Sequence, residues 1–166
     1  PADLSTFTSL DSIHIDQCPQ LEAIPDGGFP KSLVRLSISR CQNLRPKVEW
    51  FMSSLDNLLY LDIQGGNDES FPDKDLLPRS LYSLCIRDFK NLHTLNLQGL
   101  GALGILEITR CDKFASLPKR LPSSLSLLRI NGCPLLKDKI SKRDLEWFRI
   151  QDIPLVKIDG ALLRGW

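Results

Sequence analysis

The sequence lacks a run of apolar residues long enough to cross a membrane, which would take roughly 18 or more. It also lacks an excess of charge of either sign, because 21 Lys and Arg face 20 Asp and Glu and leave a net charge of +1. This balance gives no general attraction to nucleic acid or to anionic lipid. We therefore expect no membrane span and no nucleic-acid partner.

Signatures of catalysis and of cofactor binding are equally scarce. No G-x-x-x-x-G-K-[ST] phosphate loop occurs, and Gly27-Gly28 and Gly65-Gly66 read as turns. No C-x-x-C pair occurs, and neither His14 nor His93 has a Ser or a carboxylate at a recognisable triad spacing. We expect no catalytic residue, no metal site and no cofactor, and hence a protein that is not an enzyme.

What the sequence does contain is one pattern repeated seven times. Apolar-x-x-apolar-x-Ile begins at residues 10, 33, 58, 81, 103, 125 and 153, so successive copies start 22 to 28 residues apart. Leu33-Val-Arg-Leu36-Ser-Ile38-Ser-Arg-Cys41 is a complete copy, with Cys three residues after Ile. This period and this core are typical of leucine-rich repeats. We predict an α/β repeat solenoid, a leucine-rich-repeat horseshoe, over residues 1–166.

Each copy should form one short strand, since its apolar residues alternate, and the strands should pair in parallel on the concave face. The expected strands lie near residues 12–16, 35–39, 60–64, 83–87, 105–109, 127–131 and 155–159.

Between the strands the chain is rich in Pro, so the outer segments should be mostly irregular. Pro-x-Ser-Leu opens three copies, at 30–33, 78–81 and 122–125. Two short helices are expected, one over 47–55 after Pro46 and one over 141–148, with Ser141 as its cap and Asp144 three residues later. Trp50 and Trp147 should pack these turns onto the core.

Four of the five cysteines occupy the same slot of their copies, at 18, 41, 111 and 133. Side chains in this slot should point inward and donate weakly to backbone carbonyls, instead of forming disulfides, because like positions in a stack run parallel. N-x-[ST] glycosylation sites are absent as well. A reducing compartment, the cytoplasm or the nucleus, fits this cysteine usage.

The residues between the apolar positions of each strand should face solvent on the concave side. There the sequence places an aromatic, an Arg and several large apolar groups, the residue types that dominate interface energetics. The charges are of both signs, which favours a protein partner over a nucleic acid. The candidate partner-binding residues are Tyr60, Asp62, Arg87, Ile105, Glu107, Leu127 and Arg129.

The combination of Leu-x-x-Leu-x-Ile-x-x-Cys, Leu-Pro and Pro-x-Ser-Leu, most complete from Ser116 to Lys137, resembles the C-terminal repeats of plant nucleotide-binding leucine-rich-repeat immune receptors of the coiled-coil-bearing branch. Gly66 and Phe89 depart from the pattern, since they stand in the Cys slot. The resemblance implies an intracellular module that senses pathogen effector proteins and holds the receptor's own nucleotide-binding module inactive. Either of these proteins, or both, would be its partners.

The alternative is the substrate-recognition repeats of an F-box ubiquitin-ligase adaptor, although those repeats have helical outer segments and a longer period. Residues 1–9 look like the tail of an earlier repeat, from which we expect the chain to be a fragment of a longer protein.

Overall fold

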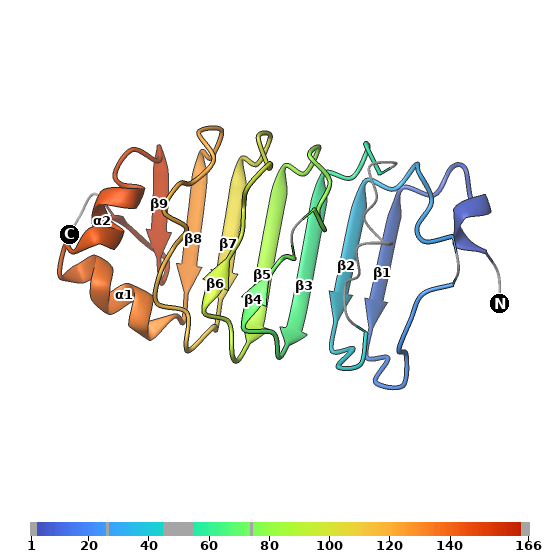
Figure 1. Cartoon of the computed structure of the whole chain (residues 1–166), viewed down its shortest axis with the longest axis horizontal. Coiled ribbons are helices and arrows are strands. Elements are labelled where there is room, and N and C mark those ends of the chain that lie inside the picture. The colour runs from blue at the N-terminus through green and yellow to red at the C-terminus, as the bar shows by residue number, and fades with distance from the viewer. Residues whose placement is uncertain (1–2, 26, 45–54, 74, 164–166) are drawn as a thin grey trace.

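The computed structural model describes residues 3–25, 27–44, 55–73 and 75–163. One long sheet runs through these residues, with one parallel strand from each copy of the repeat (Figure 1). Its parallel strands, in order, are β1 (Ser12–Asp16), β2 (Arg35–Ser39), β3 (Tyr60–Gly66), β5 (Ser83–Phe89), β7 (Ile105–Thr109), β8 (Leu127–Asn131) and β9 (Leu155–Ile158).

The strands pair in the register that the repeat predicts. Leu36 lies opposite Leu61 and Ile38 opposite Ile63, and the same Leu and Ile positions match in the next strands. The fold is therefore the predicted leucine-rich-repeat solenoid. β3 and β5 run two residues beyond the expected ends, and β9 stops at Ile158 instead of 159.

Several short elements complete the architecture. A 3₁₀ helix, η1 (Leu4–Thr6), precedes β1, and β10 (Ala161–Leu162) pairs antiparallel with β9 at the far edge of the sheet. On the outer side, β4 (Ser70–Phe71) and β6 (Thr94–Leu95) form a two-stranded parallel sheet.

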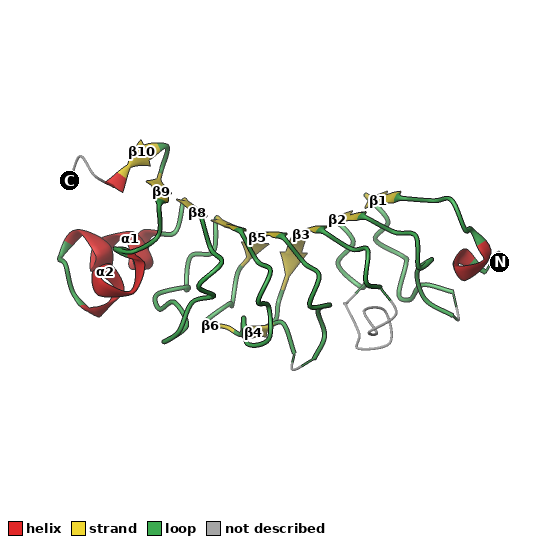
Figure 2. Ribbon diagram, turned by 90° about the horizontal axis from the view of Figure 1, so that it is seen from above, coloured by secondary structure: helices red, strands yellow, loops and turns green. Residues whose placement is uncertain are grey.

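The core lies on one side of the long sheet only. Figure 2 shows the strands along a shallow arc, with the outer segments all on its convex side. Inward-facing Leu and Ile side chains fill the space between these two layers, and Phe71 and Phe89 pack there with ring centroids 5.4 Å apart. The opposite, concave face of the sheet is left to the solvent.

The Ser of Pro-x-Ser-Leu ties each of its repeats to the one before. Ser32 Oγ donates to the carbonyl of Leu10 at 2.5 Å, Ser80 Oγ to that of Leu58 at 2.8 Å, and Ser124 Oγ to that of Leu103 at 2.7 Å. The three acceptors hold the same position in their copies. The motif therefore satisfies backbone acceptors that precede each strand.

The helices are only partly where the sequence placed them. The expected helix over 47–55, with Trp50, falls almost wholly on residues 45–54, outside the described residues. The expected helix over 141–148 is wrong in its bounds. Two helices occur instead, α1 (Pro134–Ser141) and α2 (Leu145–Ile150).

The local cause is a break at Arg143, whose φ is +53°. Ser141 ends α1 and caps nothing, whereas the Asp144 side chain caps α2 by accepting from the Glu146 N–H at 2.9 Å. Trp147 packs against the core as expected, under the Arg143 guanidinium.

The cysteine slot is confirmed as structural. Cys41, Cys111 and Cys133 are buried, and each thiol donates to the carbonyl two residues earlier, at 3.1 to 3.5 Å. Cys18 is half-buried and makes the same contact. All five cysteines are free thiols.

Candidate functional site

The concave face carries all seven predicted partner-binding residues. Tyr60, Ile105 and Leu127 lie on the amino-terminal side of their strands, and all three are half-buried. The charged candidates lie in the next two columns towards the carboxyl ends of the strands. They are Asp62, Arg87, Glu107 and Arg129.

The amino-terminal side of this face is an apolar surface built around two tyrosines. The rings of Tyr60 and Tyr82 meet edge to face, with centroids 6.3 Å apart, and the Arg35 guanidinium stacks over Tyr60 at 3.9 Å from its centroid. Leu59 and Tyr82 are 37% and 39% exposed. We call this surface the amino-edge stripe and define it as Leu59, Tyr60, Tyr82, Ile105, Leu127 and Leu155.

Tyr82, Leu59 and Leu155 were missing from the predicted set. Tyr82 and Leu59 precede their strands, so the alternation of inward and outward residues does not cover them. Tyr82 joins the stripe because Gly104 has no side chain. A Cβ added to Gly104 would lie 2.4 Å from Cε2 of Tyr82. Gly104, in the same position of the next copy, is the signal that could have revealed this placement.

The carboxyl side of the face is a set of ion pairs that join neighbouring repeats, which we call the ion-pair ladder. Its pairs are Asp16–Arg40, Asp62–Arg87, Asp88–Arg110 and Glu107–Arg129. In the first three an Arg donates through two nitrogens to both oxygens of a carboxylate in the preceding repeat. The fourth is looser, at 3.9 Å.

These contacts shift the acidity of several groups. Hydrogen bonds from Arg40 and then Ser39 lower the pKa of Asp16 to about 2. A hydrogen bond from Arg110, followed by one from Gln64, lowers the pKa of Asp88. The ladder therefore keeps these carboxylates ionised well into the acidic range.

Cys85 lies between Asp62 and Glu107 in the register of the concave face. Burial, with the charges of these two carboxylates, raises the pKa of its thiol to about 12. A thiol held in its protonated form is a poor nucleophile, so the arrangement gives Cys85 a packing role.

A shallow hollow of about 360 Å³ opens beside Gly65 and Gly66, at the carboxyl edge of the sheet. Arg40, Lys90 and Asp88 contribute charges of both signs to its lining, and Asp88 is already bound by Arg110 and Gln64. The hollow therefore offers no concentrated charge to a ligand.

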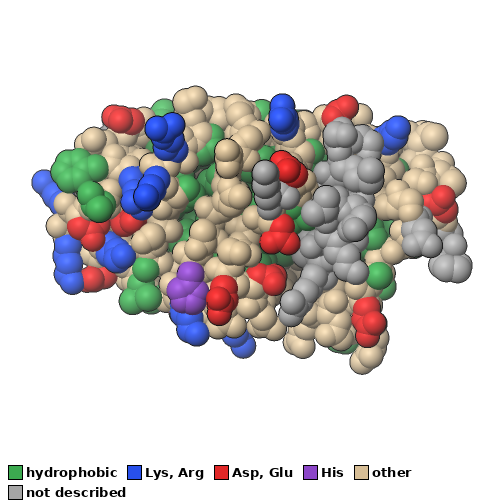
Figure 3. All heavy atoms as spheres, in the orientation of Figure 1, with side chains coloured by type: hydrophobic (Ala, Val, Ile, Leu, Met, Phe, Trp, Pro, Cys, Tyr) green, Lys and Arg blue, Asp and Glu red, His purple; other side chains and the backbone are tan. Residues whose placement is uncertain are grey.

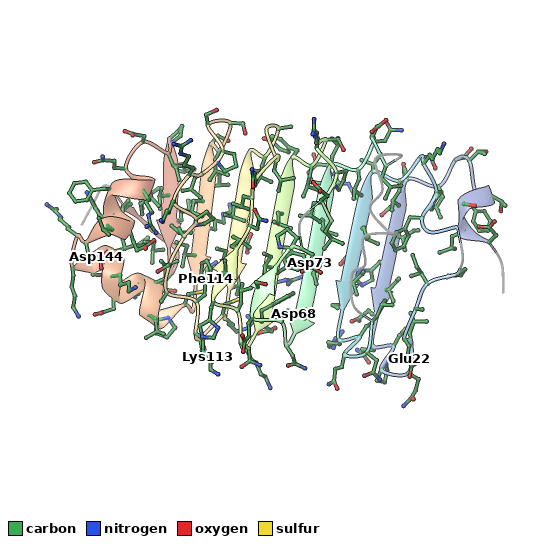
Figure 4. All side chains as sticks on the ribbon, viewed as in Figure 1. Glu22, Asp68, Asp73, Lys113, Phe114 and Asp144 are labelled. Carbon is green, nitrogen blue, oxygen red and sulfur yellow. The ribbon has the colours of Figure 1, made fainter. Side chains whose placement is uncertain are left out.

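The outer face differs from the concave one in character. Figure 3 shows charges of both signs scattered over it, with Lys and Arg gathered at the end that carries α1 and α2. The residues labelled in Figure 4, including Glu22, Asp68 and Lys113, belong to the segments of this outer side. Lys113 and Asn91 join neighbouring turns, with Nζ 3.1 Å from Oδ1.

The described residues contain neither a cluster of metal ligands nor a membrane-spanning helix. Across 3–25, 27–44, 55–73 and 75–163, no cluster of three or more His, Cys, Asp or Glu residues could hold a metal ion. No helix within these ranges has the length and apolar character needed to cross a bilayer.

Fold and face together define a leucine-rich-repeat solenoid with a rigid, amphipathic concave surface. No protein-family model matches the chain. The chain is similar to an Arabidopsis thaliana protein named "Putative disease resistance protein At3g14460", with 45% identity over 168 residues. The match covers 98% of this chain and 12% of that relative, so the chain spans about an eighth of the relative's length.

Proposed function

We propose that the chain is a non-enzymatic protein-recognition and autoinhibitory module of an intracellular plant disease-resistance receptor. In this role it senses pathogen effector proteins, contacts the receptor's own nucleotide-binding module, and works in the cytoplasm or the nucleus. The similarity to a plant protein named for disease resistance supports the plant context.

The observation that carries the recognition role is the amino-edge stripe. Its large apolar side chains are held on a sheet whose strands are fixed by pairing on both sides, so binding there orders few groups. Aromatic and apolar groups around a stacked Arg are typical of the residues that dominate protein interfaces.

The charged half of the face supports a protein partner over a nucleic acid. Each Arg of the ion-pair ladder already faces a carboxylate of the preceding repeat. A polyphosphate backbone needs uncompensated cations, whereas a protein surface can match alternating signs. Among the described residues, the outer segments between β1 and β8 contain no helix, which does not favour the helical repeats of an F-box adaptor.

The test uses a full-length receptor that carries this chain, with Tyr60→Ser and Leu127→Asp combined. Both side chains are at least partly exposed, so we expect the melting temperature to stay close to wild type. Resting immune output or effector recognition, measured as cell death after expression in leaves, should change.

The matched control is Leu145→Ser with Phe148→Ser, which removes two exposed apolar groups of α2 on the outer side. It should leave both outputs unchanged. If the concave variant folds normally and keeps wild-type resting output and recognition, the proposed function of this face is wrong.

A further inference from the structure

We infer that the partner presents an amphipathic α-helix, and that this helix lies across the strands along the amino-edge stripe. The inference rests on the proposed function, because it names the shape and chemistry of the partner that the concave face would recognise. It is carried by spacing, by backbone hydrogen bonding and by charge.

The stripe offers roughly one apolar group per strand in a straight row. In the register of the sheet, Tyr60 is followed by Ser83, Ile105, Leu127 and Leu155. At Ser83, where the row would be interrupted, the ring of Tyr82 lies against Gly104 of the next repeat. With strands about 4.8 Å apart, the row from β3 to β9 is about 19 Å long.

An α-helix matches this row, and an extended chain does not. A helix presents a side chain on one face about every 5.4 Å, so the mismatch per strand is only about 0.6 Å. An extended segment repeats on one face about every 6.6 Å, so its mismatch per strand is about 1.8 Å, three times that of the helix. A helix of about 13 residues spans the 19 Å.

Backbone hydrogen bonding points the same way. In the long sheet, β2, β3, β5, β7, β8 and β9 have neighbours on both sides, so their N–H and C=O groups are engaged within the sheet. An extended partner crossing them would leave its own backbone groups without protein acceptors or donors. A helix satisfies its backbone internally and brings only side chains to the stripe.

Cations lie near both ends of the stripe. At the β2–β3 end the Arg35 guanidinium stacks over Tyr60. At the β8–β9 end, Arg129 and Lys157 are neighbours in the register, and Glu107 compensates only Arg129, at 3.9 Å. Acidic side chains in the first or last turn of the helix complement these cations.

The experiment selects binders from a display library of random linear 16-residue peptides, with the 166-residue chain as the target. Each binder is then measured against two double variants by fluorescence anisotropy. Tyr82→Ser with Ile105→Asp alters the stripe, and Leu145→Ser with Phe148→Ser alters exposed apolar groups of the outer side.

We expect enriched peptides with apolar residues three and four apart and acidic residues near one or both ends. Their circular dichroism should gain helical signal on binding. The stripe variant should weaken their binding at least tenfold, and the outer variant should weaken it less than twofold.

Three results would overturn the inference. They are enrichment of peptides whose apolar residues alternate with period two, binders indifferent to the stripe variant, and no enrichment over a library panned without protein. These results leave the proposed function standing if Tyr60→Ser with Leu127→Asp still alters the response of the receptor. That function fails separately if the leaf assay is unchanged.

Discussion

Gly66 and Phe89 complement each other across neighbouring repeats, since a Cβ added to Gly66 would lie 2.7 Å from Cε2 of Phe89. Both residues occupy the slot that holds Cys in four other copies. The missing side chain of one repeat thus leaves room for the large ring of the next, and Phe89 is 1% exposed. The two departures from the repeat pattern are a single compensated change.

This pairing predicts non-additive stabilities. Gly66→Cys should destabilise the fold by about 1–3 kcal/mol through overpacking. Phe89→Cys should cost about 3–5 kcal/mol through the cavity it leaves. The double variant, which restores Cys in both slots, should cost clearly less than the two together. Urea unfolding of the four proteins measures this coupling. Gly101→Ala is the control, because its added Cβ meets nothing within 4 Å. Additive losses would contradict the pairing.

The cysteine slot should tolerate a smaller side chain far better than a charged one. Cys41→Ala should cost about 1–2 kcal/mol of packing. Cys41→Arg would place an unpaired cation where the native side chain is buried and should cost several kcal/mol, about 3 or more. Thermal melting of both variants checks the order. An Arg variant that melts with the wild type would mean that the slot opens to solvent.

Acid should weaken the ion-pair ladder in a defined range. The pKa of Asp16 is lowered in the folded chain, so its pairing stabilises the fold above its ordinary pKa of 3.8. That contribution is lost as the pH falls from about 4 towards 2. We expect Arg40→Gln to flatten the pH dependence of the melting temperature in this window. The pKa of Asp16, followed through the chemical shift of its carboxyl carbon, should be higher in the variant. Arg79→Gln, on an exposed outer turn, should change neither.

The last repeat is docked through a buried carboxylate, which gives the fourth prediction. Glu146 is 3% exposed, accepts from the Leu117 N–H at 2.9 Å and pairs with Arg149 at 2.8 Å. Arg149 in turn donates to the Leu117 carbonyl. Glu146→Ala should lower the free energy of unfolding, measured in urea, by about 3 kcal/mol. The reason is that it leaves the largely buried Arg149 guanidinium and the Leu117 N–H without their carboxylate partner. Glu146→Gln keeps an acceptor and should cost less. Equal losses would assign the effect to packing alone.

The fold was predictable because the same inward-facing apolar positions recur in all seven copies of the repeat. Each Leu and Ile of the pattern reports the face of its strand, so the register needed no tertiary information. Helix α1 was missed although Pro134 at its first turn, with Leu136 and Ile140 four apart, was a readable signal. The break at Arg143 gave no such signal, because Arg is not among the residues that typically adopt a left-handed backbone.

The candidate surface was only half predictable for a similar reason. Alternation identifies which residues of a strand lie on the concave face, and it found Tyr60, Ile105 and Leu127. It says nothing of side chains that reach across repeats. The ring of Tyr82 and the guanidinium of Arg35 are placed by their neighbours Gly104 and Tyr60. The pairing of Arg87 with Asp62 likewise depends on register between strands 25 residues apart in sequence.

Antiparallel β10 makes the two edges of the long sheet unequal. It occupies the outer edge of β9, while β1 has β2 on one side and no partner among the described residues on the other. β10 is the last strand of the sheet, but its two residues offer a further strand much less backbone to pair with than the five residues of β1. Very short edge strands discourage edge-to-edge pairing, so association through strand pairing should be weaker at the β10 end than at the β1 edge.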